Sequence, residues 1–128
     1  MTEQSGVRRV AEMRLRGSEG WLPLRVYWPA GADTETDAPV GLLVDLSGGA
    51  GADERCRELC VRTGSVVLSA VGPVSADDAQ VVLGWAADHA SELDADPARL
   101  SVTGDLADVV IRRACQEGWP PVRHHSDH

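Results

Sequence analysis

The spacing of hydrophobic residues changes several times along this chain and predicts short strands separated by helices. Residues Leu22–Trp28 alternate in the manner of a strand, with two different sets of side chains on its two faces. Val40–Leu46 and Ser65–Val71 are almost continuously apolar, which is typical of strands buried on both faces. Glu12–Arg16 and Arg99–Thr103 are shorter candidates. The pattern therefore predicts five strands.

Three segments have helical spacing instead. Asp53–Arg62 places Cys56, Leu59 and Cys60 on one face, and Gly64 is expected to end this helix. A second helix is predicted over Ala76–Leu93, after a capping-box-like start at Ser75. Its expected core positions are Ala79, Val82, Trp85, Ala86, Ala90 and Leu93. A third helix is predicted over Asp105–Glu117, before Gly118 and two prolines.

This order of elements predicts an α/β fold, with a predominantly parallel half-sheet and helices on both faces. The stretch "PAGADTETDAP" at residues 29–39, rich in Pro, Gly and Asp, is expected to be a surface hairpin or loop. No linker divides the chain and no repeat is visible, so residues 1–128 are interpreted as a single domain.

Composition narrows the function classes. The formal net charge of −8 argues against nucleic acid or an anionic membrane as a partner. All twelve basic residues are Arg, which excludes Schiff-base chemistry and a P-loop lysine. Apolar stretches are too short to span a bilayer, and residues 1–13 contain no signal-like apolar region, so a cytoplasmic location is expected.

Metal and cofactor signals are weak. The three cysteines give no disulfide framework, and Cys56 and Cys60 are interpreted as small buried side chains rather than a metal pair. His89 is expected to be a partly exposed helix residue. The terminal residues His124, His125, Asp127 and His128 are interpreted as a frayed tail, with weak metal binding as the alternative. We therefore predict no cofactor and no metal site.

Three longer motifs resemble one family. They are "LPLRVYWPAG", "LLVDLSGGAG" and "DDAQVVLGWAADHASELDADPARLSVTGD", the last combining a helix Trp, an Asp-Pro-x-Arg turn and a strand that runs into Gly-Asp. In this combination, from about Val10 to Arg123, the chain resembles the α/β-hydrolases of the hormone-sensitive-lipase type, which are esterases of small acyl esters. The resemblance implies the N-terminal part of an α/β-hydrolase fold.

The chain differs from this family at the positions of the family's catalytic motifs. The family reads Gly-Asp-Ser-Ala-Gly at the turn that holds its nucleophile, and this chain has Leu106 at the serine position and Asp108 at the last glycine. The family's His-Gly-Gly-Gly oxyanion motif becomes Ser47-Gly48-Gly49-Ala50. The sequence also stops where the family would begin its sixth strand, before the triad's acid and histidine. We therefore expect no standard acyl transfer and assign no catalytic residue.

A vestigial pocket remains a candidate, because the resemblance assigns oxyanion donors to the amides of Gly48, Gly49 and Ala107. Asp105 and Asp108 are expected to cap the following helix and so to disfavour an anion there. The candidate pocket residues are Ser47, Gly48, Gly49, Ala50, Asp105, Leu106, Ala107 and Asp108.

The expected function is that of a non-catalytic binding or assembly module. The strand Arg99–Thr103 would form an open sheet edge, since the tail "VRHHSDH" is too polar and short to cover it. A homodimer through this edge or through the helix Asp105–Glu117 is expected, with a related protein chain as the alternative partner. A small apolar or carbonyl ligand over Leu106 stays open as well. The alternative function is a hydrolase, lyase or cyclase with rewired residues, using Asp45, Asp105 or Asp108; a product without a selected role is the third alternative.

Overall fold

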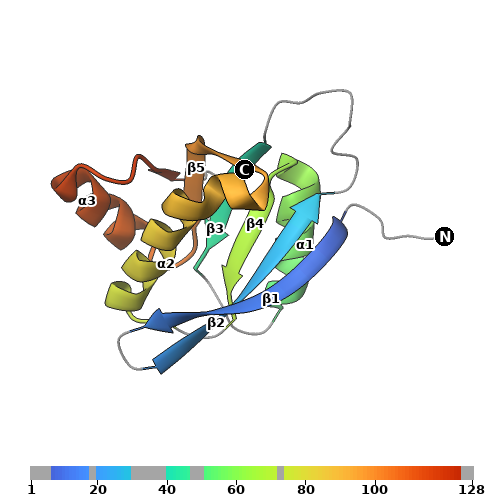
Figure 1. Ribbon diagram of the computed structural model, residues 1–128, viewed down its shortest axis with the longest axis horizontal. Coiled ribbons are helices and arrows are strands. Elements are labelled where there is room, and N and C mark those ends of the chain that lie inside the picture. The colour runs from blue at the N-terminus through green and yellow to red at the C-terminus, as the bar shows by residue number, and fades with distance from the viewer. Residues whose placement is uncertain (1–6, 18–19, 30–39, 47–50, 72–73, 125–128) are drawn as a thin grey trace.

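The computed structural model describes residues 7–17, 20–29, 40–46, 51–71 and 74–124 (Figure 1). Within these residues six strands form one sheet, in the order β1-β2-β4-β3-β5-β6. The strand bounds are β1 Val7–Gly17, β2 Gly20–Pro29, β3 Val40–Asp45, β4 Val66–Ala70, β5 Ala95–Thr103 and β6 Arg123–His124. The helices are α1 Ala52–Thr63, α2 Ala76–His89 and α3 Ala107–Glu117, and a 3-10 turn, η1 Ala90–Leu93, follows α2.

The sheet is parallel at its centre and antiparallel at one side. β3 pairs in parallel with both β4 and β5, which is the arrangement that strand–helix–strand connections produce. β1 and β2 pair with each other along their whole length, and β2 joins β4 in the antiparallel sense. The predicted α/β class is confirmed, and the five predicted strands are present.

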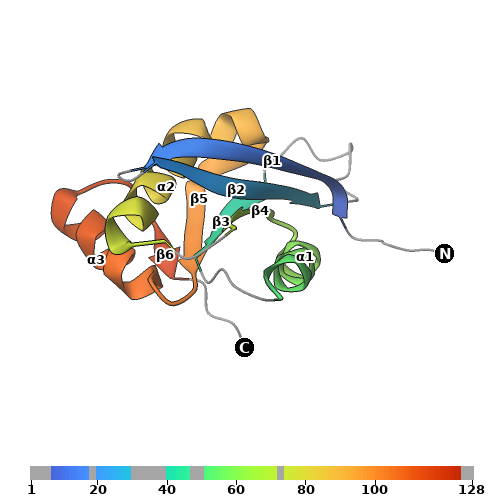
Figure 2. The same ribbon diagram turned by 90° about the horizontal axis from the view of Figure 1, so that it is seen from below.

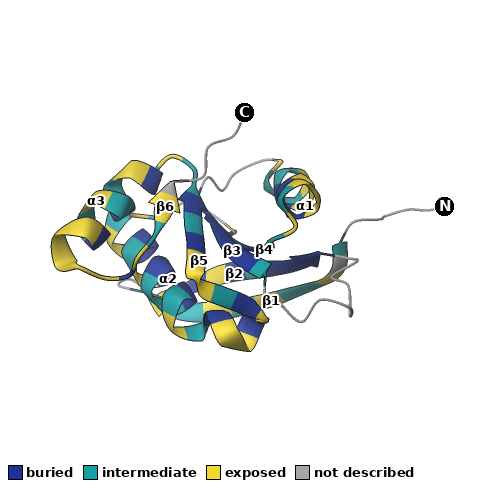
Figure 3. Ribbon diagram, turned by 90° about the horizontal axis from the view of Figure 1, so that it is seen from above, coloured by how far each residue is buried: buried dark blue, intermediate teal, exposed yellow. Residues whose placement is uncertain are grey.

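Helices cover both faces of the sheet, as predicted. α1 lies alone on one face, and α2 and α3 lie on the other (Figure 2). Adjacent residues of β3 point to opposite faces of the sheet and pack in different cores. Leu42 and Val44 belong to the larger core with α2 and α3. Leu43 packs with Tyr27, Cys56 and Cys60 beneath α1. The strands at the centre are therefore buried on both sides (Figure 3).

The ends of the first two helices follow the sequence signals, with one exception. Gly64 ends α1 in the left-handed region at φ 66°, and the hydroxyl of Ser75 accepts a hydrogen bond from the amide of Asp78 at 3.1 Å. The second helix is shorter than predicted, because regular α-helix stops at His89 and continues as η1. The tighter turn leaves the Leu93 carbonyl oxygen to accept a 2.9 Å hydrogen bond from the indole of buried Trp28.

The prediction of a bare edge at Arg99–Thr103 is wrong at one end of the strand. Residues Arg123 and His124 pair in parallel with Ser101 and Val102 as β6. The tail is polar, but strand pairing uses backbone groups rather than apolar side chains. Pro120 is buried and Val122 packs against the core, so the segment before β6 is anchored well enough to place it.

Candidate functional site

The turn between β5 and α3 is the place where the resemblance puts the nucleophile of the esterase family, and where this chain is predicted to have Leu106 instead. β5 ends at Thr103, and Gly104 follows with φ 112°, a value that favours glycine. The Leu46 amide donates to the Thr103 carbonyl oxygen at 2.9 Å, which joins the ends of β3 and β5. The sharp turn is therefore present, and its unusual backbone angle is at Gly104.

Leu106 occupies the apex as a packing residue. It has φ −99° and ψ 8°, outside the left-handed region, and it precedes the first residue of α3. Its side chain is half-buried and contacts the larger core. A hydrocarbon side chain offers neither a nucleophile nor a proton donor, so this position holds none of the atoms that acyl transfer requires.

The amide of Ala107 is already engaged. It donates to the Gly104 carbonyl oxygen at 3.1 Å, and Ala107 itself is fully buried. In this conformation the amide does not offer a donor to a bound carbonyl group. The other predicted donors, Gly48 and Gly49, lie outside the described residues together with Ser47 and Ala50, so the oxyanion pocket as a whole stays a prediction.

The two aspartates beside the apex differ from the capping prediction. The N-cap residue of α3 is Leu106 and not Asp105, so the capping role predicted for Asp105 is wrong. Both carboxylates are exposed, and Asp108 lies in the first turn of α3, where the helix dipole favours a negative charge. The helix begins two residues later than predicted because Asp105 and Leu106 still belong to the turn.

Sequence reasoning gave too little weight to Asp45, the last residue of β3. Its side chain is completely buried beside the turn, since the register places Asp45 opposite Thr103 on one side and Ser69 on the other. The Arg55 guanidinium lies 3.3 Å from Asp45 Oδ2 and the Cys56 thiol donates to the same oxygen at 3.2 Å. The signal in the sequence is a single carboxylate at the end of an apolar strand.

This arrangement fixes α1 to the sheet rather than forming a reactive centre. Burial raises the pKa of Cys56 to about 12, and the neighbouring Asp45 charge acts in the same direction. Cys56 is therefore a neutral thiol that donates a hydrogen bond, and not a thiolate nucleophile. Burial also raises the pKa of Cys60 to about 11. The prediction that both cysteines are buried side chains is confirmed.

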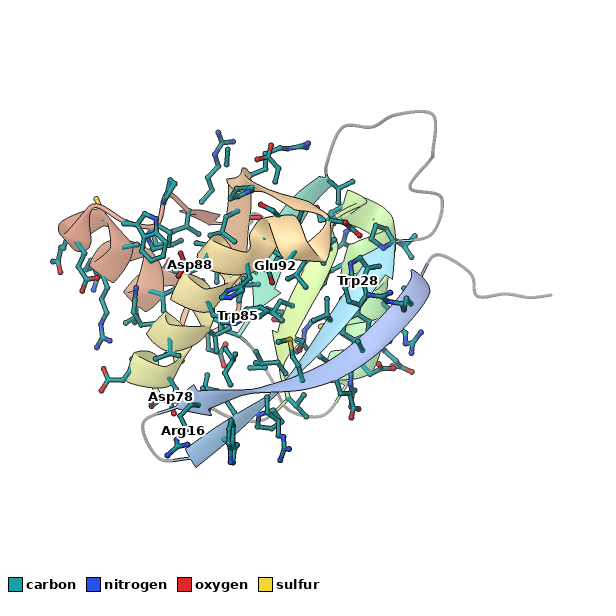
Figure 4. The ribbon with its side chains drawn as sticks, viewed as in Figure 1. Arg16, Trp28, Asp78, Trp85, Asp88 and Glu92 are labelled. Atoms are coloured by element: carbon teal, nitrogen blue, oxygen red, sulfur yellow. The ribbon has the colours of Figure 1, made fainter. Side chains whose placement is uncertain are left out.

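The histidine on α2 does not lie near the apex. His89 is partly exposed, as predicted; its Nδ1 is 2.9 Å from the Trp85 carbonyl oxygen and its ring stacks on Trp85. Because α2 starts near the end of β4 and leads to the start of β5, its last residue lies at the opposite end of the sheet from Leu106. Trp85 and Asp88 are labelled on α2 in Figure 4.

The described residues contain neither a metal-binding cluster nor a helix that could span a membrane. No group of three His, Cys, Asp or Glu side chains among them is arranged to hold a metal ion. None of their helices combines the length and the apolar character that a bilayer crossing requires. Three members of the predicted terminal cluster, His125, Asp127 and His128, lie outside the described residues.

Solved structures resemble this fold closely. An esterase from the archaeon Pyrobaculum calidifontis superposes with a TM-score of 0.77 at 26% identity, over 91% of this chain and 43% of that one. EstE1, a carboxylesterase cloned from a metagenomic library, superposes with a TM-score of 0.75 at 29% identity, over 91% of this chain and 45% of that one. The chain has the α/β-hydrolase fold and is similar to these esterases.

A curated relative agrees with this assignment. Esterase LipI of Mycobacterium tuberculosis is 29% identical over 132 aligned positions, which cover 89% of this chain and 41% of LipI. No family model matches the chain. The α/β-hydrolase homologue described here thus spans less than half the length of these relatives, and the predicted resemblance to hormone-sensitive-lipase-type esterases is confirmed.

Proposed function

We propose that this α/β-hydrolase homologue is a non-catalytic module that acts through association with a second protein chain. The observation that carries the proposal is Leu106, a half-buried hydrocarbon at the position of the esterase nucleophile. The nucleophile belongs to the part of the fold that this chain contains, so residues supplied by another segment would not replace it.

The second part of the proposal concerns the β5–β6 end of the sheet. β6 pairs with only two residues of β5 among the described residues, so most of the outer edge of β5 carries no strand there. Next to it, α3 and the segment after it form an apolar groove of about 330 Å³, bounded by Ile111, Ala114, Cys115, Pro121 and Val122. Trp119, between α3 and β6, is 46% exposed. An unpaired edge beside an apolar groove favours association, and we propose a second copy of this chain as the partner.

Light scattering coupled to size exclusion tests the association. A homodimer gives about 27 kDa, twice the chain mass of 13.6 kDa, over 1–100 μM protein. Cys115→Glu places a charge in the groove and is expected to give the monomer mass, because burying an unpaired carboxylate is costly. Val61→Glu is the matched control, since Val61 is 56% exposed on α1 at the other face.

A monomer at 100 μM contradicts the homodimer. Recovery of a related hydrolase chain bound to the purified protein, lost in Cys115→Glu, instead supports the same surface with a different partner. Dimerisation that Cys115→Glu leaves intact would place the interface elsewhere.

The alternative is an enzyme with rewired residues. Asp45 is completely buried against Arg55 and Cys56, so a substrate does not reach it in this conformation, and Asp105 and Asp108 are the carboxylates left to this alternative. Hydrolysis of p-nitrophenyl acetate discriminates the two functions. We expect the rate of the Leu106→Ala variant and of the unaltered chain to equal the rate in buffer. Turnover abolished by Asp108→Ala or Asp105→Ala would support the enzyme.

The pocket over Leu106 is the remaining proposal. A small apolar or carbonyl ligand bound there should raise the melting temperature of the unaltered chain, with p-nitrophenol and ethyl acetate as probes. Leu106→Asp should lose that shift, while Val81→Asp, an exposed position on α2, should retain it.

A further inference from the structure

Arg14, Arg16 and Trp21 form a cluster at the end of the β1–β2 hairpin, at the sheet edge opposite to β6. The register places Arg16 directly opposite Trp21, and Arg14 lies two residues away on the same face. The two guanidinium carbons lie 5.5 and 5.4 Å from the indole centroid. Trp21 is nevertheless 58% exposed, so the cluster is a surface feature. Figure 4 shows Arg16 at this end of the hairpin.

These two arginines differ from their neighbours in what they contact. Arg25 forms ion pairs with Glu12 at 2.9 Å and with Asp53 at 3.7 Å, and Arg9 lies 4.0 Å above the ring of Trp28. Arg14 and Arg16 instead both lie over the exposed indole of Trp21. Stacking on an indole orients a guanidinium while its N–H groups stay available to an external acceptor.

The charge of this strand is opposite to that of the chain. The chain has a net charge of −8, yet four of the eleven residues of β1 are Arg and one is Glu. A basic strand on an acidic protein attracts carboxylates locally, while the rest of the molecule repels extended polyanions such as nucleic acid.

The backbone of β1 adds a second binding element. β1 is the first strand in the sheet order, so its outer edge carries no strand in the part of the chain that is described. A shallow groove of about 270 Å³ lies beside the cluster, bounded by Arg14, Pro23, Val71 and the ion pair of Glu12 with Arg25. Val71 is 39% exposed there. An edge strand with a neighbouring groove accepts an extended peptide through backbone hydrogen bonds and alternate side chains.

We propose that the β1 edge and the cluster of Arg14, Arg16 and Trp21 bind an extended acidic peptide segment of a partner protein. The peptide adds as a strand to β1, its carboxylates contact the two guanidinium groups, and an apolar side chain enters the groove. Guanidinium–carboxylate pairs are frequently bidentate, so they fix the relative orientation of the two groups in addition to pairing their charges. A second copy of this chain is the wrong occupant, because two basic strands would face each other.

Fluorescence anisotropy with a labelled peptide of alternating Glu and Val tests the proposal, against a peptide of alternating Gln and Val. The full chain should bind the Glu peptide at least about tenfold more tightly than the Gln peptide. Arg14→Gln combined with Arg16→Gln should raise the Kd of the Glu peptide by about tenfold, and Trp21→Ser by about threefold. Arg112→Gln, an exposed arginine on α3, is the charge-matched control and should leave the Kd within about twofold.

Strand addition has its own readout. N-methylation of alternate peptide amides on the edge that faces β1 should raise the Kd by about tenfold, and methylation of the outward amides should not. Equal binding of the Glu and Gln peptides, an unchanged Kd in the double Arg variant, or tighter binding of a single-stranded DNA of equal charge would each overturn the proposal. Circular dichroism of each variant verifies that it is folded. Binding should persist in Cys115→Glu, which separates this surface from the proposed dimer interface.

Discussion

The amide of Ala107 donates a 3.1 Å hydrogen bond to the carbonyl oxygen of Gly104, across the turn that leads from β5 into α3. This bond closes the turn with a group that the esterase resemblance assigns to the oxyanion. Together with Leu106 at the apex, it removes both a nucleophile and a donor from the same loop.

Restoring the hydroxyl alone should not create an esterase. We expect Leu106→Ser to hydrolyse p-nitrophenyl acetate no faster than Leu106→Ala. His89 cannot act as the base of this serine, because it lies at the other end of the sheet. Stopped-flow absorbance at 400 nm measures the rate. A serine-dependent burst in Leu106→Ser would instead reveal a base near the turn.

The contact between Arg55 and Asp45 should be measurable as a coupling energy. Arg55→Gln is expected to lower the free energy of unfolding by about 1–3 kcal/mol, because it removes a cation from a buried carboxylate. The same change in an Asp45→Asn background should cost less. Arg57→Gln, which removes an exposed pair with Asp53, is the control and should cost at most about 1 kcal/mol. Urea denaturation measures all four variants, and equal costs in both backgrounds would exclude the coupling.

The three thiols should differ in reactivity. At pH 8 the chain, diluted to its monomeric form, should release one equivalent of thionitrobenzoate rapidly, from Cys115, and the two further equivalents only in denaturant. In the proposed dimer Cys115 is covered, and the first equivalent should be released slowly. Burial raises the pKa of Cys56 to about 12 and of Cys60 to about 11, so neither is a thiolate at this pH. Cys115→Ser should abolish the rapid phase. A rapid reaction in that variant would show that the layer beneath α1 opens readily.

Stability should fall in alkaline solution. Burial raises the pKa of Tyr27 to about 12, from an ordinary value of 10, so the folded state holds the phenol neutral where the unfolded chain ionises. Tyr27, Cys56 and Cys60 all have raised pKa values in the folded state. Their contribution to the free energy of unfolding is therefore complete below about pH 9 and is lost as the pH rises towards 12. Urea denaturation between pH 7 and 11 should show this loss, and Tyr27→Phe should make it shallower. An unchanged slope in Tyr27→Phe would contradict the assignment.

Two glycines should respond oppositely to alanine. Gly104→Ala should lower the free energy of unfolding by about 1–3 kcal/mol, because φ 112° is strained for any residue with a Cβ. Gly84→Ala should raise it by about 0.5–1 kcal/mol, since Gly84 lies within α2 and the nearest described neighbour of a Cβ there is the Trp119 ring, at an ordinary contact distance of 3.6 Å. Thermal melts of both variants test the pair. A neutral Gly104→Ala would mean that the turn relaxes without cost.

The sequence predicted the parts of the fold that depend on local chemistry. Alternation in Leu22–Trp28, the glycine at residue 64 and the serine at residue 75 each gave an element or an end that the structure confirms, since periodicity and caps act over a few residues. The β6 pairing was missed because it depends on a contact between segments about twenty residues apart and on the anchoring of Val122.

The position of the site could be predicted from the sequence, but its hydrogen bonds and buried contacts could not. Leu106 was placed at the apex by alignment of one motif, and the structure has it there. The engaged amide of Ala107 and the buried contacts of Asp45 arise from backbone geometry and from packing against α1, and neither has a sequence signature. A carboxylate at the end of an apolar strand was the one available clue, and its meaning depended on which helix covers it.

The alternation along β5 limits what kind of chain completes the sheet. Leu100 and Val102 turn towards α2 and α3, whereas Ser101 and Thr103 on the other face are only partly buried. That face of β5 is therefore partly exposed to solvent. A strand that pairs beside β6 therefore needs apolar side chains on one face only. A single amphipathic helix packed behind that strand would be enough to cover the apolar layer shared with α2 and α3.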